Sequence, residues 1–115
     1  MRKLMILMAL LTAFGLPAFL SADSPMPSMR LVEPTVAAAG DTVKVTGENL
    51  DRTNVAALYL TDGKNDIKVT IIEETANTIL FKVPAKVETG RLALMVLTTG
   101  QNPKLIEEPV KVTIE

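Results

Sequence analysis

The segment Val43-Lys44-Val45-Thr46-Gly47-Glu48-Asn49-Leu50 carries the clearest structural signal of this 115-residue chain. Apolar and polar side chains alternate in its first half, with Val43 and Val45 on one side and Lys44 on the other. This period of two is typical of a half-buried β-strand. Gly40-Asp41 turns the chain into the segment. We expect Gly47 to end the strand at a position whose backbone dihedrals are unusual for other residues.

The same alternation recurs on both sides of this segment, and turn-forming residues such as Asp62-Gly63 and Gly100-Gln101-Asn102-Pro103 separate the repeats. Pro34 should place the first strand at a sheet edge, and Pro109 should cause a bulge or an edge crossing in the last one. No helical stripe interrupts this series, so we predict an all-β antiparallel sandwich. The seven predicted strands are residues 30–33, 42–46, 55–61, 67–72, 78–83, 91–98 and 104–114.

The landmarks and their order resemble the IPT/TIG family of immunoglobulin-like domains. The shared features are a leading proline, a glycine before the second strand, the block V-x-V-x-G-x-N-hydrophobic, a Val-Pro pair and a late glycine. In this chain they are Pro34, Gly40, residues 43–50, Val83-Pro84 and Gly90 before Leu92-Ala93-Leu94-Met95-Val96. The resemblance covers about residues 29–115 and implies an immunoglobulin-like β-sandwich. The chain lacks the Trp and paired Cys of antibody-type domains, which favours this family over an antibody-like one.

The alternation also predicts the core, because inward-facing positions of both sheets must be apolar. The expected core residues are Val43, Val45, Leu58, Leu60, Val69, Ile71, Ile79, Phe81, Leu92, Leu94, Val96, Val112 and Ile114.

The N-terminus has the layout of a secretory signal peptide. Arg2 and Lys3 precede an apolar run at 4–16, and small residues follow. The run is short for a membrane span, which needs about 20 residues. We predict a signal peptide at 1–22, cleaved after Ala22 or, as a second choice, after Ala18. A linker at 23–28 and one domain at 29–115 follow. The mature protein is then exported, periplasmic or extracellular, with no stable membrane span.

Charge and composition exclude several classes of function. Removing residues 1–22 takes away Arg2 and Lys3, so 12 basic residues become 10 against 13 acidic ones, a net charge of −3. A mildly acidic domain is a poor partner for nucleic acid, where phosphate neutralisation dominates affinity. Arg52 is the one basic residue between Gly47 and Leu60, so the DNA contacts made by loops of some IPT/TIG members are not expected here.

The chain contains neither His nor Cys, so the commonest general base, the thiol nucleophile and the usual transition-metal ligands are missing. We therefore expect no enzymatic activity and no cofactor. Glu73-Glu74 and Glu107-Glu108 are adjacent carboxylates, but neighbours in a strand point to opposite faces and should be surface charges. The segment 62–66 only loosely resembles a calcium loop and is expected to be a hairpin turn.

One predicted surface is more apolar than a sheet face in contact with water needs to be. The strands at 55–61 and 91–98 are neighbours in an immunoglobulin-type sandwich, and their outward positions are unusually apolar. We predict that this face docks a protein partner or a second copy of the chain. The alternative is a face covered by a linker or loop, or of no consequence. The residues of the predicted face are Ala57, Tyr59, Ala93, Met95 and Leu97.

The predicted function is that of a non-enzymatic exported binding or structural module that makes protein contacts through a sheet face or an edge strand. The alternative is a carbohydrate-binding or cell-envelope accessory module, since some IPT/TIG members are attached to polysaccharide-degrading enzymes. Aromatic stacking is not favoured, because the mature chain has only Tyr59 and Phe81. A polar sugar site would depend on loop residues such as Asn49, Asp51 or Asn54.

Overall fold

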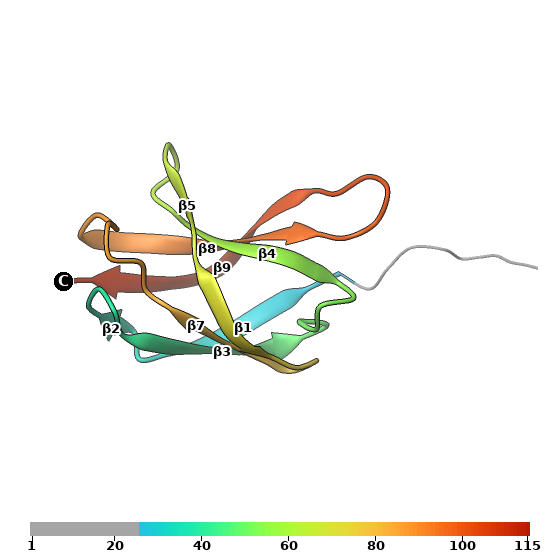
Figure 1. Cartoon of the computed structure of the whole chain (residues 1–115), viewed down its shortest axis with the longest axis horizontal. Helices are drawn as coiled ribbons and strands as arrows, with labels where there is room; N and C mark the ends of the chain where they lie inside the picture. The colour runs from blue at the N-terminus through green and yellow to red at the C-terminus, as the bar shows by residue number, and fades with distance from the viewer. Residues whose placement is uncertain (1–25) are drawn as a thin grey trace, which may run out of the picture.

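The computed structural model describes residues 26–115 as two β-sheets packed face to face (Figure 1). The four-stranded sheet has the order β1-β3-β7-β6, and the five-stranded sheet has the order β2-β9-β8-β4-β5. Neighbouring strands are antiparallel except for the pair β2–β9. The predicted all-β immunoglobulin-like sandwich is confirmed. The predicted signal peptide at 1–22 lies outside the described residues, as does the first half of the predicted linker, residues 23–25.

The described residues form nine strand segments, where the sequence predicts seven strands. They are β1 (Ser28–Glu33), β2 (Val36–Ala37), β3 (Thr42–Glu48), β4 (Val55–Thr61), β5 (Asp66–Lys68), β6 (Thr70–Glu74), β7 (Thr78–Lys82), β8 (Gly90–Thr98) and β9 (Leu105–Ile114).

The core lies between the two sheets and follows the predicted alternation. Every predicted core residue is buried except Ile71, which is partly buried and packs against the cluster. Further core residues come from β1, from β2, from the ends of predicted strands and from a loop, at positions outside the predicted core set. These additional core residues are Met29, Val32, Ala37, Leu50, Val55 and Val83.

The predicted strand at 67–72 is divided between the two sheets. Its first part, β5, pairs with β4, and its second part, β6, pairs with β7. Val69 lies at the crossing, where its N–H donates to the carbonyl oxygen of Leu58 at 3.0 Å. Figure 1 shows this segment running from one sheet to the other across the edge of the sandwich. Because Ile67, Val69 and Ile71 keep their alternation through the crossing, the sequence pattern does not reveal it.

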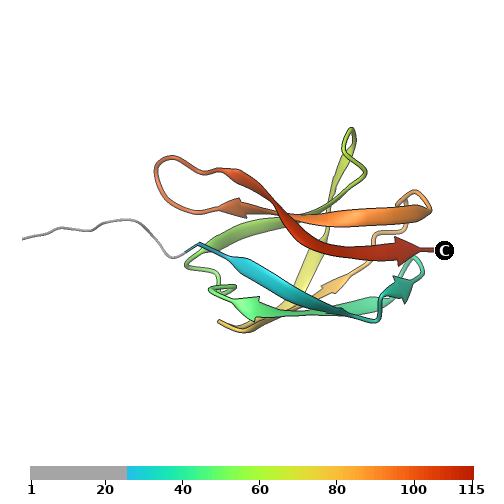
Figure 2. The same cartoon turned by 180° about the vertical axis from the view of Figure 1, so that it is seen from behind.

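The N-terminal strand also changes sheets. β1 forms an edge of the four-stranded sheet, which confirms the edge position predicted from Pro34. After Pro34 the chain reaches the other sheet, where the short β2 runs parallel to β9. Figure 2, which views the molecule from behind, shows β1 (light blue) and β9 (red) on the side nearest the viewer. A two-residue strand carries no periodicity, and the sequence therefore did not predict β2.

The prediction for Gly47 was wrong in both position and cause. Gly47 lies inside β3 opposite Met29, and the positive φ of this region belongs to Asn49, at 58°. A Cβ atom on Gly47 would collide with the backbone carbonyl oxygen of Ser28. The glycine is therefore required by the close approach of β1 to β3.

A buried carboxylate joins the sheets next to Pro109. The register of β9 against β8 shifts here, with Glu107 opposite Met95 but Lys111 opposite Ala93, so the predicted bulge is confirmed. Glu108, only 4% exposed, accepts a hydrogen bond from the N–H of Met29 at 2.9 Å. Its other oxygen is buried without a partner among residues 26–115. Burial raises the pKa of Glu108, and the Met29 hydrogen bond partly opposes this.

Candidate functional site

The outer face of the five-stranded sheet brings the predicted face residues together. β4 and β8 are neighbours, as expected, and directly opposite residues of two paired strands point to the same side. Ala57 is opposite Leu97, and Tyr59 is opposite Met95. Ala93 is opposite Thr61, two residues further along each strand and therefore on the same side of the sheet. Their inward neighbours on the same strands form the core, so these side chains point away from it.

The exposure of this face is uneven. Ala57 and Ala93 are only 5% and 6% exposed, whereas Tyr59, Met95 and Leu97 are partly buried. A methyl group beside longer side chains is covered by them, so the two alanines form the floor of the face rather than its contact surface. The side chains that a partner could touch are those of Tyr59, Met95 and Leu97.

The flanking strands add residues that sequence reasoning missed. Leu105 of β9, 55% exposed, is opposite Leu97 and extends the apolar surface. Lys68 of β5 is opposite Tyr59, and Glu107 of β9 is opposite Met95. We use "docking face" for the predicted residues Ala57, Tyr59, Ala93, Met95 and Leu97 together with this border of Lys68, Leu105 and Glu107.

The docking face is apolar in its middle and charged at its border. Its middle is an aromatic ring, a thioether and aliphatic groups, with opposite charges at the two sides. Tyr and Met are enriched in the cores of protein interfaces, and polar residues in their rims.

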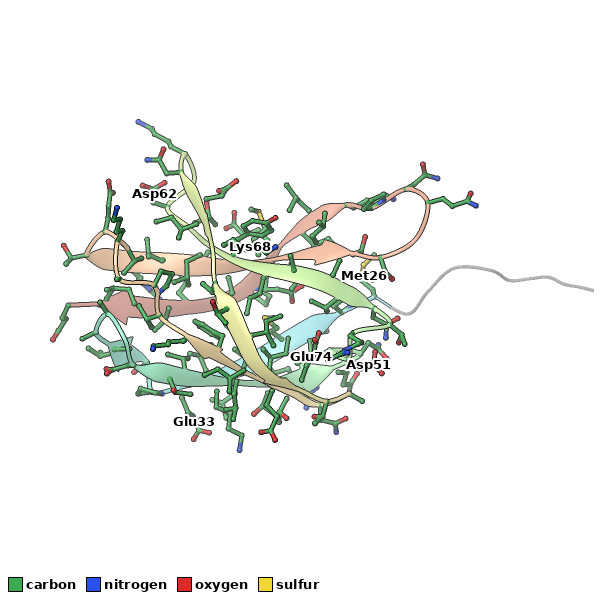
Figure 3. The ribbon with its side chains drawn as sticks, viewed as in Figure 1. Met26, Glu33, Asp51, Asp62, Lys68 and Glu74 are labelled. Carbon is green, nitrogen blue, oxygen red and sulfur yellow. The ribbon has the colours of Figure 1, made fainter. Side chains whose placement is uncertain are left out.

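A groove lies at the open edge of the sandwich, between β4 and β6. β5 pairs with β4 only at 59–61, so in the described chain residues 55–57 have no neighbouring strand on that side. The resulting groove has a volume of about 920 Å³. Arg52 lines it, and so does Glu74, one of whose carboxylate oxygens is buried without a partner in residues 26–115. Figure 3 shows Glu74 close to Asp51 at one end of this region, with Lys68 towards the other.

The groove is a consequence of the sheet crossing at Val69, which the sequence did not reveal. Burial raises the pKa of Glu74, the charge of Arg52 lowers it, and that of Asp51 raises it. A register shift next to Ile72 turns Glu74 towards the inner side, opposite the buried Ile79. The prediction that the adjacent carboxylates are surface charges was therefore wrong for two of them: Glu108 is buried, and Glu74 is partly buried with one buried carboxylate oxygen.

A polar sugar site would depend on the loop after β3. The polar side chains of this loop form hydrogen bonds within the protein. Asp51 accepts hydrogen bonds from Thr53 at 2.7 Å and from the side chain of Asn54 at 2.9 Å. Asn54 is only 7% exposed, and the side-chain amide of Asn49 donates to the carbonyl oxygen of Met26 at 3.2 Å. These three residues hold the loop after β3 in shape.

The segment 62–66 is a hairpin turn between β4 and β5. The Asp62 carboxylate accepts hydrogen bonds from the N–H groups of Asn65 and Lys64 at 2.7 and 2.8 Å, and these bonds lower its pKa. The part of the chain that the structure describes brings no three His, Cys, Asp or Glu residues together in a group that could hold a metal ion. In the same residues there is no helix long and apolar enough to cross a membrane.

Several solved structures contain a similar domain. A protein of unknown function from Bacteroides thetaiotaomicron is 20% identical, with a TM-score of 0.67 over 82% of this chain and 23% of its own. An auxiliary nutrient binding protein from Bacteroides ovatus is 20% identical, with a TM-score of 0.55 over 79% of this chain and 21% of its own. At such identities the likeness concerns the fold alone.

A third similar structure is the mixed-linkage glucan utilization locus protein SGBP-B of Bacteroides ovatus, in complex with a mixed-linkage heptasaccharide. It is 17% identical, with a TM-score of 0.50 over 70% of this chain and 21% of its own. The present chain thus spans about a fifth to a quarter of the length of these three proteins. Among curated proteins, none matches the chain.

The family expectation from Pro34, Gly40, residues 43–50, Val83-Pro84 and Gly90 is confirmed. The family model described as the IPT/TIG domain matches residues 27–113, nearly all of the part that the structure describes. The chain therefore belongs to the IPT/TIG domain family.

Proposed function

We propose that this chain is a non-enzymatic, exported binding module whose docking face contacts a protein partner, either a different protein or a second copy of the chain. The observation that carries the proposal is the register of β4 and β8, which places Tyr59 beside Met95 and Ala57 beside Leu97. The fold does not need these apolar outward positions, because the inward residues of the same strands already form the core. An apolar patch with a charged border is what a protein interface offers.

Two further observations support a binding role in the cell envelope. The basic, then apolar, then small pattern of residues 1–22 favours export. The similar structures also include proteins described as binding nutrients or a glucan heptasaccharide. Either compartment, periplasm or cell exterior, agrees with these observations.

The test compares two charge substitutions on opposite faces. Met95→Glu places a carboxylate in the docking face, and Leu31→Glu places one on the four-stranded sheet, where Leu31 is 48% exposed. Wild-type and variant proteins are immobilised and exposed to an envelope extract of the source cells. We expect Met95→Glu alone to lose at least about tenfold in bound partner, because burying an unpaired charge opposes association. Equal retention by wild type and Met95→Glu, with both folded by circular dichroism, would refute the proposal.

A second candidate is carbohydrate binding through the same face. Tyr59 offers one partly exposed ring with Lys68 on one side and Met95 on the other, and a single ring can stack on a sugar. Affinity electrophoresis in mixed-linkage glucan tests this. Sugar binding predicts that glucan retards the wild type and that Tyr59→Ala migrates freely, whereas an unretarded wild type removes the candidate for that glucan.

A further inference from the structure

We infer that the partner of the docking face is a second copy of this chain, packed face to face about a twofold axis that runs parallel to the strands between β4 and β8. This inference rests on the proposed function of the docking face and names its partner. It follows from the order of charges across the sheet, from the shape of the sheet and from the size of the patch.

The charges are self-complementary along the central row of the face. Across β5, β4, β8 and β9 this row reads Lys68, Tyr59, Met95 and Glu107. Rotation by 180° about the proposed axis reverses the order of the row. Lys68 of one copy then faces Glu107 of the other, twice per dimer, while Tyr59 faces Met95 in the middle. An isologous interface requires such matching of a surface with itself.

The next row along the strands is also self-complementary, but here the negative residue is on β5 and the positive residue is on β9. It reads Asp66, Thr61, Ala93 and Lys111 in the same strand order. The same rotation brings Asp66 of one copy over Lys111 of the other. All four charged residues are exposed, and the ion pair recorded within residues 26–115 is that of Arg30 with Glu48 on the other sheet. These charges are therefore available to a partner.

The sheet also has a shape that suits this axis. Figure 1 shows the β4–β5 hairpin and the far end of the β8–β9 hairpin rising above the sheet at opposite corners. Such a saddle is the ordinary result of strand twist. A twofold rotation about a line parallel to the strands maps a saddle onto itself, so the raised corners of one copy lie over the low corners of the other. Two sheets packed in this way keep their strands nearly aligned.

The size of the patch indicates a weak dimer. Four strands spaced about 4.8 Å apart and six residues of about 3.3 Å each cover about 400 Å² per copy. The total of about 800 Å² is below the range of stable interfaces, which predicts a dissociation constant in the micromolar range or above. The concentration series must therefore extend to about 500 μM to populate the dimer.

The decisive experiment exchanges the charges of the central row. Protein from expression of the full chain is studied by sedimentation equilibrium as wild type, Lys68→Glu, Glu107→Lys and an equimolar mixture of the two variants. Each variant alone should dimerise at least about tenfold more weakly than wild type, because symmetry introduces two like-charge contacts. In the mixture each variant finds opposite charges at both contacts, so a heterodimer should form with about wild-type affinity.

Lys44→Glu, an exposed reversal on the outer face of the four-stranded sheet, is the matched control and should dimerise like wild type. Recovery of association in the mixture also shows that both variants are folded. Any of three results would overturn the inference. Wild type could stay monomeric, both charge-reversal variants could dimerise as strongly as wild type, or the mixture could stay monomeric. If the inference fails in one of these ways while Met95→Glu still loses capture of a different protein, the proposed function stands. If Met95→Glu loses nothing, both fall.

Discussion

The outer faces of the two sheets differ although their inner faces are alike. Outward positions of the four-stranded sheet mix charged and polar residues, such as Lys44 beside Glu33 and Lys82 beside Thr42, with single apolar residues such as Leu31. The docking face of the five-stranded sheet instead has Tyr59 beside Met95 at its centre. The hydrophobic effect requires only one apolar face per sheet. The second apolar face therefore points to a role other than folding.

The largest expected difference between residues needed for folding and residues of the outer face is within β8, where inner and outer residues alternate. Leu94 is fully buried and Met95 is only partly buried. Leu94→Ala should lower the free energy of unfolding by about 2–5 kcal/mol, because it leaves a cavity in the core. Met95→Ala should cost less than about 1 kcal/mol. Urea denaturation of both variants measures the difference, and equal losses would mean that the outer face contributes to the fold as the core does.

The edge of the four-stranded sheet offers the next largest effect. Gly47→Ala places a Cβ atom against the Ser28 carbonyl oxygen, and a backbone atom cannot move aside as a flexible side chain can. We expect a loss of about 3 kcal/mol and separation of β1 from β3. Thermal denaturation and amide exchange of β1 check this. A variant as stable as wild type, with β1 still protected, would contradict the close approach.

Glu108 tests the tie between the sheets. Glu108→Ala removes the acceptor of the Met29 N–H and should cost about 1–3 kcal/mol, because a buried donor is left unsatisfied. Glu108→Gln keeps an acceptor oxygen and should cost less. Urea denaturation of the two variants at pH 7 separates these outcomes, and equal losses would show that the hydrogen bond is not what matters.

The raised pKa of Glu108 also predicts a dependence on pH. The folded state holds the Glu108 proton more tightly than the unfolded state, so this stabilisation is complete below the ordinary pKa of 4.5 and is lost as the pH rises through the raised value. Wild type should therefore lose stability relative to Glu108→Gln as the pH rises from 4.5. Denaturation curves at several pH values measure the difference, and parallel profiles would contradict a raised pKa.

The smallest effect on stability is expected at the two faces themselves. Leu31→Glu should alter the free energy of unfolding by no more than about 0.5 kcal/mol. Met95→Glu should lower it by up to about 1 kcal/mol, because the new carboxylate lies directly opposite Glu107. Their effects on association should differ, as proposed above. Calorimetry of both variants at low protein concentration measures the stability alone, and a large loss in Met95→Glu would show that the face is part of the packed structure.

Sequence reasoning predicted the fold wherever alternation was long enough to read. The segments 42–46, 55–61, 78–83 and 91–98 overlap observed strands, and the neighbouring positions of β4 and β8 were expected. It missed the places where the chain changes sheets. A crossing at Val69 preserves the alternation, and β2 is too short to show any.

The centre of the candidate site was predictable, but its border was not. Tyr59 and Met95 share a face because of the strand period and the family fold alone. The placement of Lys68 and Glu107 depends on the exact register of β5 and β9, which the hairpin at 62–65 and the bulge next to Pro109 determine. The pairing of residues between two such strands cannot be worked out from the sequence when a bulge adds residues to one of the strands.

The measurement that tests the central claim most directly is light scattering over a concentration series for wild type, Met95→Glu and Leu31→Glu. Protein from expression of the full chain is used for all three. The account predicts that the mass of wild type and of Leu31→Glu rises from monomer towards dimer, while Met95→Glu remains a monomer. A mass that rises equally in all three proteins, or in none, would contradict it.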